Sequence, residues 1–362
     1  MKRVFKWFGI AMLLLLIVMG VNAWRVSAPV VVVEPFRPTL DSVAMSQRLA
    51  AALAIPTTSA TAESPSLDRF LELHTLLQTQ FPRVHAQLER EVVADASLLY
   101  RWKGREACPG VLLAAHQDVV PVEAGSETRW IKPPFSGAVA DGFIWGRGAL
   151  DDKGSVVAIL EGVERLVRAG FVPQRTVYLA FGHDEELSGV YGARAIAALL
   201  RERGVHLDFV LDEGMIIADG MMPGARQPVA LVGLAEKGYL SLELLAHSSG
   251  GHSSMPPPHT AVGVLSRAVQ RIEDHPFPTD LRPPASQLFA YVGPDLGGPL
   301  RYVFTNLWLL RPIVMWQLGQ KASTAAMLRT TTAATIFEGG PKDNVLPQRA
   351  RAVVNLDRKS VV

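Results

Sequence analysis

The sequence predicts an α/β fold with a mostly parallel sheet, accompanied by a smaller inserted α+β domain. Three observations support this. The length of 362 residues is typical of two domains. From about residue 95, short apolar runs alternate with amphipathic helical patterns, which favours a parallel sheet. Near Gln227 the pattern changes to longer strands around one helix.

Residues 1–24 form a membrane-targeting segment. Lys2, Arg3 and Lys6 precede an uncharged run from Trp7 to Trp24, and these 18 residues just span a bilayer core. Residues 21–23, Val-Asn-Ala, also fit the small-residue site of a cleaved signal, so an anchor and a signal both stay open. Basic residues before the span place the main part of the chain outside the cytoplasm, either membrane-anchored or exported.

Residues 25–65 are rich in Pro, Ser, Thr and Ala and predict a linker that contains one short helix, DSVAMSQRLAAAL. The next run, SLDRFLELHTLLQTQFPRVHAQL, has helical spacing, with Ser66 or Asp68 as its cap.

The first domain, residues 66–226, continues after this run with four predicted strands and two further predicted helices. The helices cover residues 153–169 and 192–203, and the strands are VLLAAH, FIWGRG, TVYLAFGHD and DFVLDEG.

The second domain, residues 227–356, has the pattern of an antiparallel sheet with helices on one face. VALVGLAEKGYLSLELLAH predicts two strands, TAVGVLSRAVQRIED a helix, and TTTAATIFEGG and RARAVVNL two more strands. The stretch from His275 to Ala322 is rich in Pro and aromatic residues, and its pattern assigns it no structure.

Charge and cysteine content exclude several classes of protein. The formal net charge is +2, and no Lys/Arg block is interleaved with aromatic residues, so no nucleic-acid partner is expected. The one cysteine, Cys108, excludes an intrachain disulfide framework and a Cys-rich zinc finger.

Every unusual polar cluster of the first domain follows a predicted strand. Because ligands bind at the carboxyl ends of strands in α/β sheets, the four ends should converge on one pocket. So many carboxylates cannot all stay ionised unless a cation neutralises them. The clusters contain His116 with Asp118, Asp151 with Asp152, Asp184 to Glu186, and Asp212 with Glu213.

A divalent metal is the simplest such cation. One imidazole with several carboxylates suits Zn²⁺, Co²⁺ or Mn²⁺. Asp118 is expected to accept the second ring N–H of His116 and so to orient it.

The chain resembles the zinc-dependent aminoacylase and carboxypeptidase family, which includes glutamate carboxypeptidase. Within it, the chain is most similar to the carboxypeptidase S-like branch, with its N-fatty-acyl amino acid hydrolases. The resemblance covers roughly residues 65–355 and rests on LLAAHQDVVPV, WGRGALDDKGS, FGHDEELSG, VLDEG, GGHSSMPP and EGGPKDNVLP. It implies a dinuclear zinc hydrolase that cleaves an amide bond in peptides or N-acyl amino acids, with the second domain as a lid and dimerisation domain.

The resemblance assigns roles to individual residues. His116 and Asp212 would bind the first metal, with Glu213 the less favoured alternative to Asp212. Asp151 would bridge two metals and precede a cis peptide bond. Glu186 would bind the second metal.

The remaining implied roles concern catalysis and substrate. Glu185 would be the general base that takes a proton from the attacking water. His252 would stabilise the oxyanion, often across a homodimer, and Asn344 would help to hold substrate. His183 and His247 receive no role in the family, and Asp184 is expected to be structural.

The carboxyl end departs from the family pattern. The family has a further histidine ligand for the metal that Glu186 binds, beyond the equivalent of AVVNL, whereas residues 357–362 read DRKSVV. We therefore expect an aberrant, truncated end, and the alternative function is an impaired remnant or a metal-binding module with part of the dinuclear site. Aromatic residues within 275–322 favour a hydrophobic acyl or side-chain group in the substrate.

Overall fold

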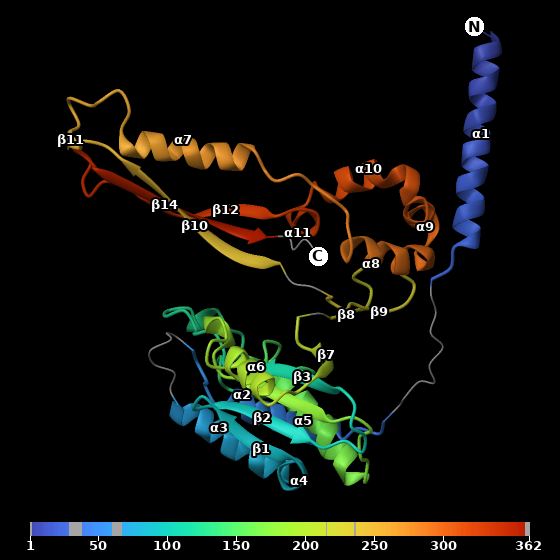
Figure 1. The fold of residues 1–362 in the computed structure, drawn as a ribbon, viewed down its shortest axis with the longest axis vertical. Helices are drawn as coiled ribbons and strands as arrows, with labels where there is room; N and C mark the ends of the chain where they lie inside the picture. The colour runs from blue at the N-terminus through green and yellow to red at the C-terminus, as the bar shows by residue number, and fades with distance from the viewer. Residues whose placement is uncertain (1, 29–37, 60–66, 215, 235–236, 359–362) are drawn as a thin grey trace. The chain divides into compact units, whose positions relative to one another are not determined.

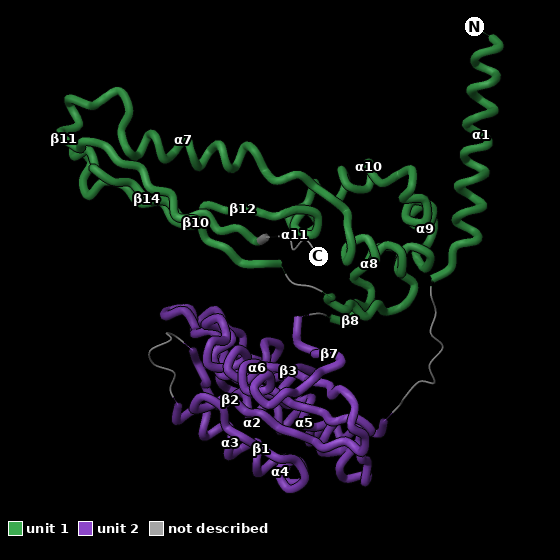
Figure 2. The backbone as a smooth tube through the Cα atoms, viewed as in Figure 1, with its two compact units in different colours: residues 1–34, 215–362 green, residues 35–214 purple. Residues whose placement is uncertain are grey.

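The computed structural model describes residues 2–28, 38–59, 67–214, 216–234 and 237–358. The chain forms two compact units (Figure 2). Unit 2 comprises residues 35–214, and unit 1 comprises residues 1–34 and 215–362. The expected cap Ser66, parts of the expected linker and the last residues of the expected aberrant end lie outside the described residues.

Unit 2 contains a five-stranded sheet in the order β1-β2-β6-β3-β7 (Figure 1). β3 pairs in parallel with β6 and β7, and β2 pairs antiparallel with β1 and β6. The predicted α/β class is confirmed, with an antiparallel edge that the sequence pattern does not indicate. The strands are β1 (Glu89–Val93), β2 (Ser97–Trp102), β3 (Gly110–His116), β6 (Val177–Gly182) and β7 (Leu207–Leu211).

Helices cover both faces of this sheet. In β6, Leu179 and Phe181 pack into a core with α3 and α5, whereas Tyr178 and Ala180 pack into a second core with α6. Because both faces are buried, the central strands are apolar at successive positions. The helices and 3-10 turns of unit 2 are α2 (Ser42–Leu53), α3 (Leu67–Gln80), α4 (Pro82–Gln87), η1 (Glu127–Arg129), α5 (Lys153–Arg168), η2 (Glu185–Leu187) and α6 (Ala193–Glu202).

The run FIWGRG forms a strand outside the main sheet, so the expectation of four converging strand ends is corrected to three. β5 (Phe143–Trp145) pairs antiparallel with β4 (Ala138–Ala140). Asp141 and Gly142 connect them with φ values of 57° and 80°, the left-handed conformations that a two-residue hairpin turn requires. Asp151 therefore reaches the sheet edge from a loop.

The helix expected inside the linker is present as α2 and packs in unit 2. The Asp41 carboxylate caps it, accepting the Ala44 N–H at 3.0 Å. At its other end, the buried Lys153 ammonium donates to Ala52 O at 3.0 Å and to Ile55 O. These contacts connect α2 to the start of α5.

Unit 1 contains a three-stranded antiparallel sheet in the order β10-β14-β12. One helix, α7 (Ala261–Asp274), packs on it through Ala261 and Leu265, and Thr260 caps this helix through the Gly263 N–H. β8 pairs with β9, and β11 pairs with β13, in two separate two-stranded sheets. The strands of unit 1 are β8 (Ile217–Ala218), β9 (Val229–Ala230), β10 (Gly238–His247), β11 (Gly251–His252), β12 (Thr331–Glu338), β13 (Val345–Leu346) and β14 (Arg349–Arg358).

The stretch without a sequence assignment is largely helical. It contains α8 (Ala285–Val292), η3 (Gly293–Asp295), α9 (Gly298–Phe304) and α10 (Leu307–Leu318), and α11 (Ala322–Ala326) begins at its last residue. At the amino terminus, α1 (Lys2–Arg25) contains an 18-residue window with a mean hydropathy of 2.4 and, among the described residues, is the one helix long and apolar enough to cross a membrane.

A buried Gln–His pair lies beneath the carboxyl end of β3. His74 Nε2 lies 2.8 Å from Gln117 Oε1, and the Gln117 amide donates to Phe181 O at 2.8 Å and Ala96 O at 3.0 Å. Burial, together with the Arg90 charge, lowers the pKa of His74 to about 4 despite the Gln117 hydrogen bond. The folded protein therefore holds this ring neutral.

We predict that this ring makes unit 2 acid-labile. The pKa of His74 is lower in the folded than in the unfolded protein. Its contribution to the free energy of unfolding is therefore fully present above the unfolded pKa of about 6.5 and is lost as the pH falls towards about 4. The free energy of unfolding should fall by on the order of 2 to 3 kcal/mol. Urea unfolding across this range should show a shallower pH dependence for His74→Gln than for the wild type. His206 is exposed, so His206→Gln is the matched control. An equally shallow pH dependence of unfolding in this control would contradict the prediction.

Candidate metal centre and active site

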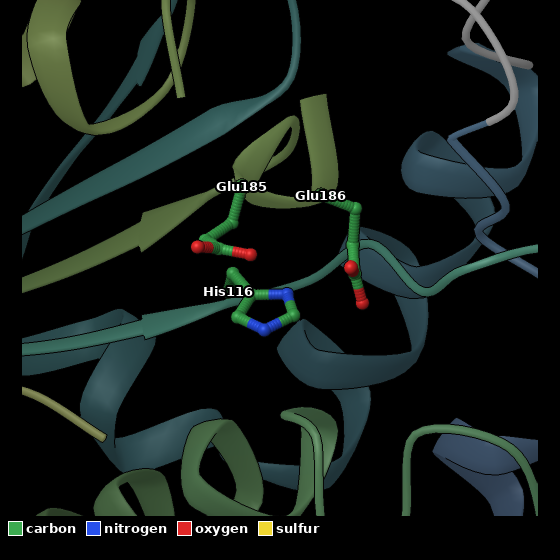
Figure 3. Close-up of side chains that lie close together, drawn as sticks. All are labelled: His116, Glu185 and Glu186. Atoms are coloured by element: carbon green, nitrogen blue, oxygen red, sulfur yellow. The ribbon is translucent and has the colours of Figure 1, made fainter. Parts of the chain in front are cut away.

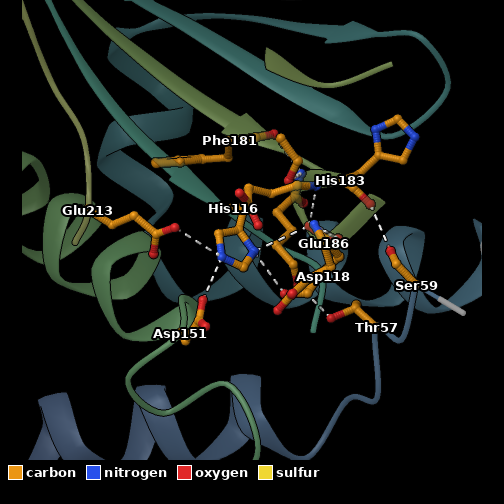
Figure 4. Close-up of polar contacts among 12 residues, drawn as sticks. Thr57, Ser59, His116, Asp118, Asp151, Phe181, His183, Glu186 and Glu213 are labelled. Atoms are coloured by element: carbon orange, nitrogen blue, oxygen red, sulfur yellow. Dashed lines mark hydrogen bonds and ion pairs between the residues drawn. The ribbon is translucent and has the colours of Figure 1, made fainter. Parts of the chain in front are cut away.

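His116 is the last residue of β3, and its ring is 2% exposed. Its Nε2 lies 2.8 Å from Asp151 Oδ1 and 3.5 Å from Glu213 Oε1 (Figure 4). Its Nδ1 lies 3.0 Å from the main-chain oxygen of Asp118 and 3.3 Å from that residue's carboxylate. The imidazole is thus surrounded by acidic residues that come from separate segments of unit 2.

Two groups of side chains have the arrangement of metal ligands, and they share His116. One contains Glu185 and Glu186 (Figure 3), and the other contains Asp151 and Glu213. Within each group, one ligand atom from every residue lies within 4.8 Å of the others. The structure therefore brings together the strand ends of β3, β6 and β7 with the loop that contains Asp151.

The Asp118 carboxylate organises the acidic turn after β6. It is fully buried and accepts hydrogen bonds from the main-chain N–H groups of Glu185 and Glu186, each at 3.1 Å. The sequence predicts its contact with His116 but not these two hydrogen bonds. Asp118 therefore positions both glutamates as well as the imidazole.

Residues before α3 support the loop after β3. Thr57 Oγ1 donates to Gln117 O at 2.6 Å, and Ser59 N–H donates to Val119 O at 3.2 Å. Ser59 Oγ also donates to His183 O at 3.2 Å. The sequence offers little signal for these contacts, because Thr57 and Ser59 lie in a stretch with linker composition.

Asp184 and His183 make structural contacts. Asp184 Oδ2 accepts the Tyr191 N–H at 2.7 Å. A Cβ at Gly192 would lie 2.5 Å from Asp184 Oδ1, so this close approach requires glycine. His183 Nδ1 lies 2.6 Å from Ser97 Oγ, and its ring packs edge-on against Phe70.

Burial and mutual repulsion shift the titration of the acidic residues. Burial raises the pKa of Glu185, Glu186 and Glu213, and neighbouring carboxylates raise these pKa values further. Burial alone would lower the pKa of His116, but Asp118, Glu213 and Asp151 outweigh it and raise this pKa to about 10.

The donor set fits a divalent metal. Each group offers one imidazole nitrogen and two carboxylates, the ligand types of Zn²⁺ and similar borderline cations. A metal ligand must be an unprotonated nitrogen, so binding here is coupled to loss of the His116 proton. The expected cis peptide bond is confirmed between Asp151 and Asp152.

Asp212 and Glu213 differ in their surroundings. Glu213 reaches His116, whereas Asp212 Oδ1 accepts the Glu213 N–H at 3.0 Å, and Asp212 belongs to neither ligand group of the described residues. Both follow β7, which ends at Leu211. The strand pattern could not choose between them, because strand alternation is not maintained past the last paired residue.

His252 and Asn344 lie together in unit 1. β11 pairs with β13 through His252 and Val345, and the Ser253 N–H donates to Asn344 O at 3.1 Å. His252 Nδ1 accepts the Ser254 N–H at 3.2 Å. These two predicted residues are thus neighbours, although they are 92 positions apart, 344 minus 252.

Comparison with known proteins assigns the chain to a family. Residues 112–307 match the model of peptidase family M20/M25/M40, and the chain belongs to this family. It is 45% identical to the probable carboxypeptidase S-like 2 of Dictyostelium discoideum, over 88% of this chain and 62% of the relative. It is 42% identical to the N-fatty-acyl-amino acid synthase/hydrolase PM20D1 of Xenopus tropicalis, over 85% and 60% respectively. The chain thus spans about three fifths of the length of these relatives.

Solved structures support the fold. The M20 family metallo-carboxypeptidase Sso-CP2 from Sulfolobus solfataricus aligns with a TM-score of 0.60, at 19% identity, over 87% of this chain and 71% of that chain. Human carnosine dipeptidase 1 aligns with a TM-score of 0.53, at 15% identity, over 88% and 70%. The recognised family and the predicted α/β fold are therefore confirmed.

Isosteric variants of the two neighbouring acids identify which one binds metal. We predict that Glu213→Gln weakens zinc binding at least about 10- to 100-fold, because it removes a carboxylate beside His116. Asp212→Asn should change the affinity little. Zinc competition with a chelator measures both. The opposite ranking would return the ligand role to Asp212.

Proposed function

We propose that this chain hydrolyses amide bonds in peptides or N-acyl amino acids, as a metal-dependent hydrolase of the carboxypeptidase and aminoacylase type. The observation that carries this proposal is the pair of ligand groups that share His116, with Glu185 beside them, in a chain of family M20/M25/M40. Two zinc ions are the proposed cofactors, and Co²⁺ or Mn²⁺ also suit these ligands.

His116, Asp151, Glu186 and one acid from Asp212 and Glu213 would hold the metals. When bound there, divalent cations would polarise the scissile carbonyl and lower the pKa of the attacking water. The residues around them would position substrate and transfer protons.

Glu185 is the proposed general base. Its backbone is fixed by the Asp118 carboxylate, and burial raises its pKa above the ordinary range. A raised pKa suits a group that takes a proton from water and delivers it to the leaving amine. Glu186, its neighbour, would bind metal.

His252 is the proposed oxyanion donor, and Asn344 is proposed to hold substrate. Because His252 Nδ1 accepts the Ser254 N–H, its neutral ring carries the proton on Nε2, which is then available as a donor. Asn344 Oδ1 is buried and has no hydrogen-bond partner among the described residues, which favours a substrate donor there. Unit 1 would act as lid and dimerisation domain.

The proposed location follows from α1. The helix would anchor the chain in a membrane with unit 2 on the extracytoplasmic side, since Lys2, Arg3 and Lys6 precede the span. A cleaved signal would instead give an exported protein.

Glu185→Gln tests the catalytic assignment. The variant should lose activity by about 10²- to 10⁴-fold while it keeps its zinc, because the amide cannot take the proton. Glu186→Gln is the matched control next to it and should lose zinc as well. Zinc content and turnover are measured on the same preparations. Loss of zinc from Glu185→Gln alone would mean that the two roles are exchanged.

Substrate length and polarity test the proposed substrate class. The relatives named N-fatty-acyl-amino acid synthase/hydrolase favour a hydrophobic group. With zinc, kcat/KM should be higher for long-chain N-acyl amino acids and hydrophobic dipeptides than for short polar dipeptides. A preference for short polar substrates would contradict the substrate class but leave amide hydrolysis intact. Zinc binding without any hydrolysis would instead favour the metal-binding module.

A further inference from the structure

The α10 helix carries large apolar side chains on its surface. We call Trp308, Leu309, Ile313 and Trp316 the α10 stripe, and they are 61%, 37%, 61% and 64% exposed. Their spacing places them on one side of the helix. α10 has 12 residues, too few to span a bilayer, and exposed apolar patches of this kind mark surfaces that contact a protein or a membrane.

The region around the stripe contains few charges, and its basic groups have partners. From Ala285 to Gln320 only Asp295, Arg301 and Arg311 are charged. Arg301 donates to the main-chain oxygens of Ala23 at 2.8 Å and of Val26 at 3.0 Å, and also to Pro294 O. Arg311 donates to Asp280 at 2.9 Å. These groups can therefore lie near an apolar phase at a reduced cost of desolvation.

α9 and the two residues that follow it, Thr305 and Asn306, pack against the carboxyl-terminal half of α1, all within unit 1 (Figure 1). Asn22 Nδ2 donates to Thr305 O at 2.7 Å, and Asn306 Nδ2 donates to Met19 O at 3.1 Å. Tyr302 OH donates to Leu16 O at 3.0 Å. Hydrogen bonds of this kind stabilise contacts between helices in membranes.

The position of these contacts along α1 determines the depth of α9. Leu16 precedes Trp24 by eight residues, which is about 12 Å of helix at 1.5 Å per residue. Half of a bilayer core is about 15 Å. If the run from Trp7 to Trp24 spans the core, Tyr302 meets α1 well inside the leaflet that contains the carboxyl end of α1.

We propose that α9 and α10 insert into the extracytoplasmic leaflet beside α1, and that the α10 stripe contacts lipid. This inference goes beyond the proposed hydrolysis and rests on α1 acting as the anchor. Trp308 and Trp316 suit this position, since tryptophan is enriched at membrane interfaces. The same contacts cover the expected cleavage site, because Asn22 donates a hydrogen bond to Thr305 O just after α9, and Ala23 O accepts one from Arg301 of α9.

Single spin labels on the full chain in lipid vesicles test the insertion. With Cys108→Ser removing the one native cysteine, Ile313→Cys labels the stripe and Val18→Cys labels α1, while Ile131→Cys labels an exposed isoleucine of unit 2. Oxygen dissolves in the bilayer and a nickel chelate stays in water. The ratio of oxygen to nickel collisions should be several-fold higher at 313 than at 131, and close to that at 18.

Each other outcome overturns the proposal. A ratio at 313 equal to that at 131 would place α10 in water. Low collision rates with both reagents at 313 would mean that protein covers the stripe, as in a second copy. An aqueous ratio at 18 would mean that α1 does not span the bilayer. A label at Trp316→Cys repeats the measurement one turn further along α10, so that local disturbance at one site cannot decide the result.

Discussion

The buried carboxylate of Asp118 determines the geometry of the metal centre. It accepts two hydrogen bonds from the main chain of Glu185 and Glu186 and lies 3.3 Å from the His116 ring, so one group fixes three ligand candidates. Burial alone would raise the pKa of this carboxylate, but the hydrogen bond and charge of His116 and the Glu186 N–H hold the pKa below the usual range. Loss of this one charge would release the imidazole and the acidic turn together.

The scaffold beneath this carboxylate is rigid because both faces of the sheet are buried. Alternate side chains of β6 enter two separate cores, so a shift in register would move a whole set of apolar groups to the wrong core. Gln117, which follows β3, is linked to β6 and to the start of β2 by hydrogen bonds to Phe181 O and Ala96 O. The strand ends are thereby held at fixed positions, as close approach of several carboxylates requires.

The sequence predicted the parts of this arrangement that depend on local pattern. Apolar strands followed directly by acids located His116, Glu185 and Glu186, and helical spacing located α5 and α7. The pattern failed where pairing decides the structure: β5 is apolar like a core strand, yet the left-handed turn at Asp141 pairs it with β4. It failed again after β7, where no ladder continues to orient Asp212 and Glu213.

Asn22 illustrates the same limit in α1. In sequence it lies between two small apolar residues and resembles part of a cleavage site. In the fold its amide bonds to Thr305 O, and nearly 300 residues separate the partners, so no local pattern could reveal the contact. The carboxylates of unit 2 and the polar groups between α1 and α9 obey one rule: a polar group removed from water needs a partner. In unit 2 the acidic side chains gather around the His116 ring, and in unit 1 the partner is the main chain of a neighbouring segment. A search for the partners of buried polar groups therefore locates both the candidate metal centre and the contact of α1 with α9.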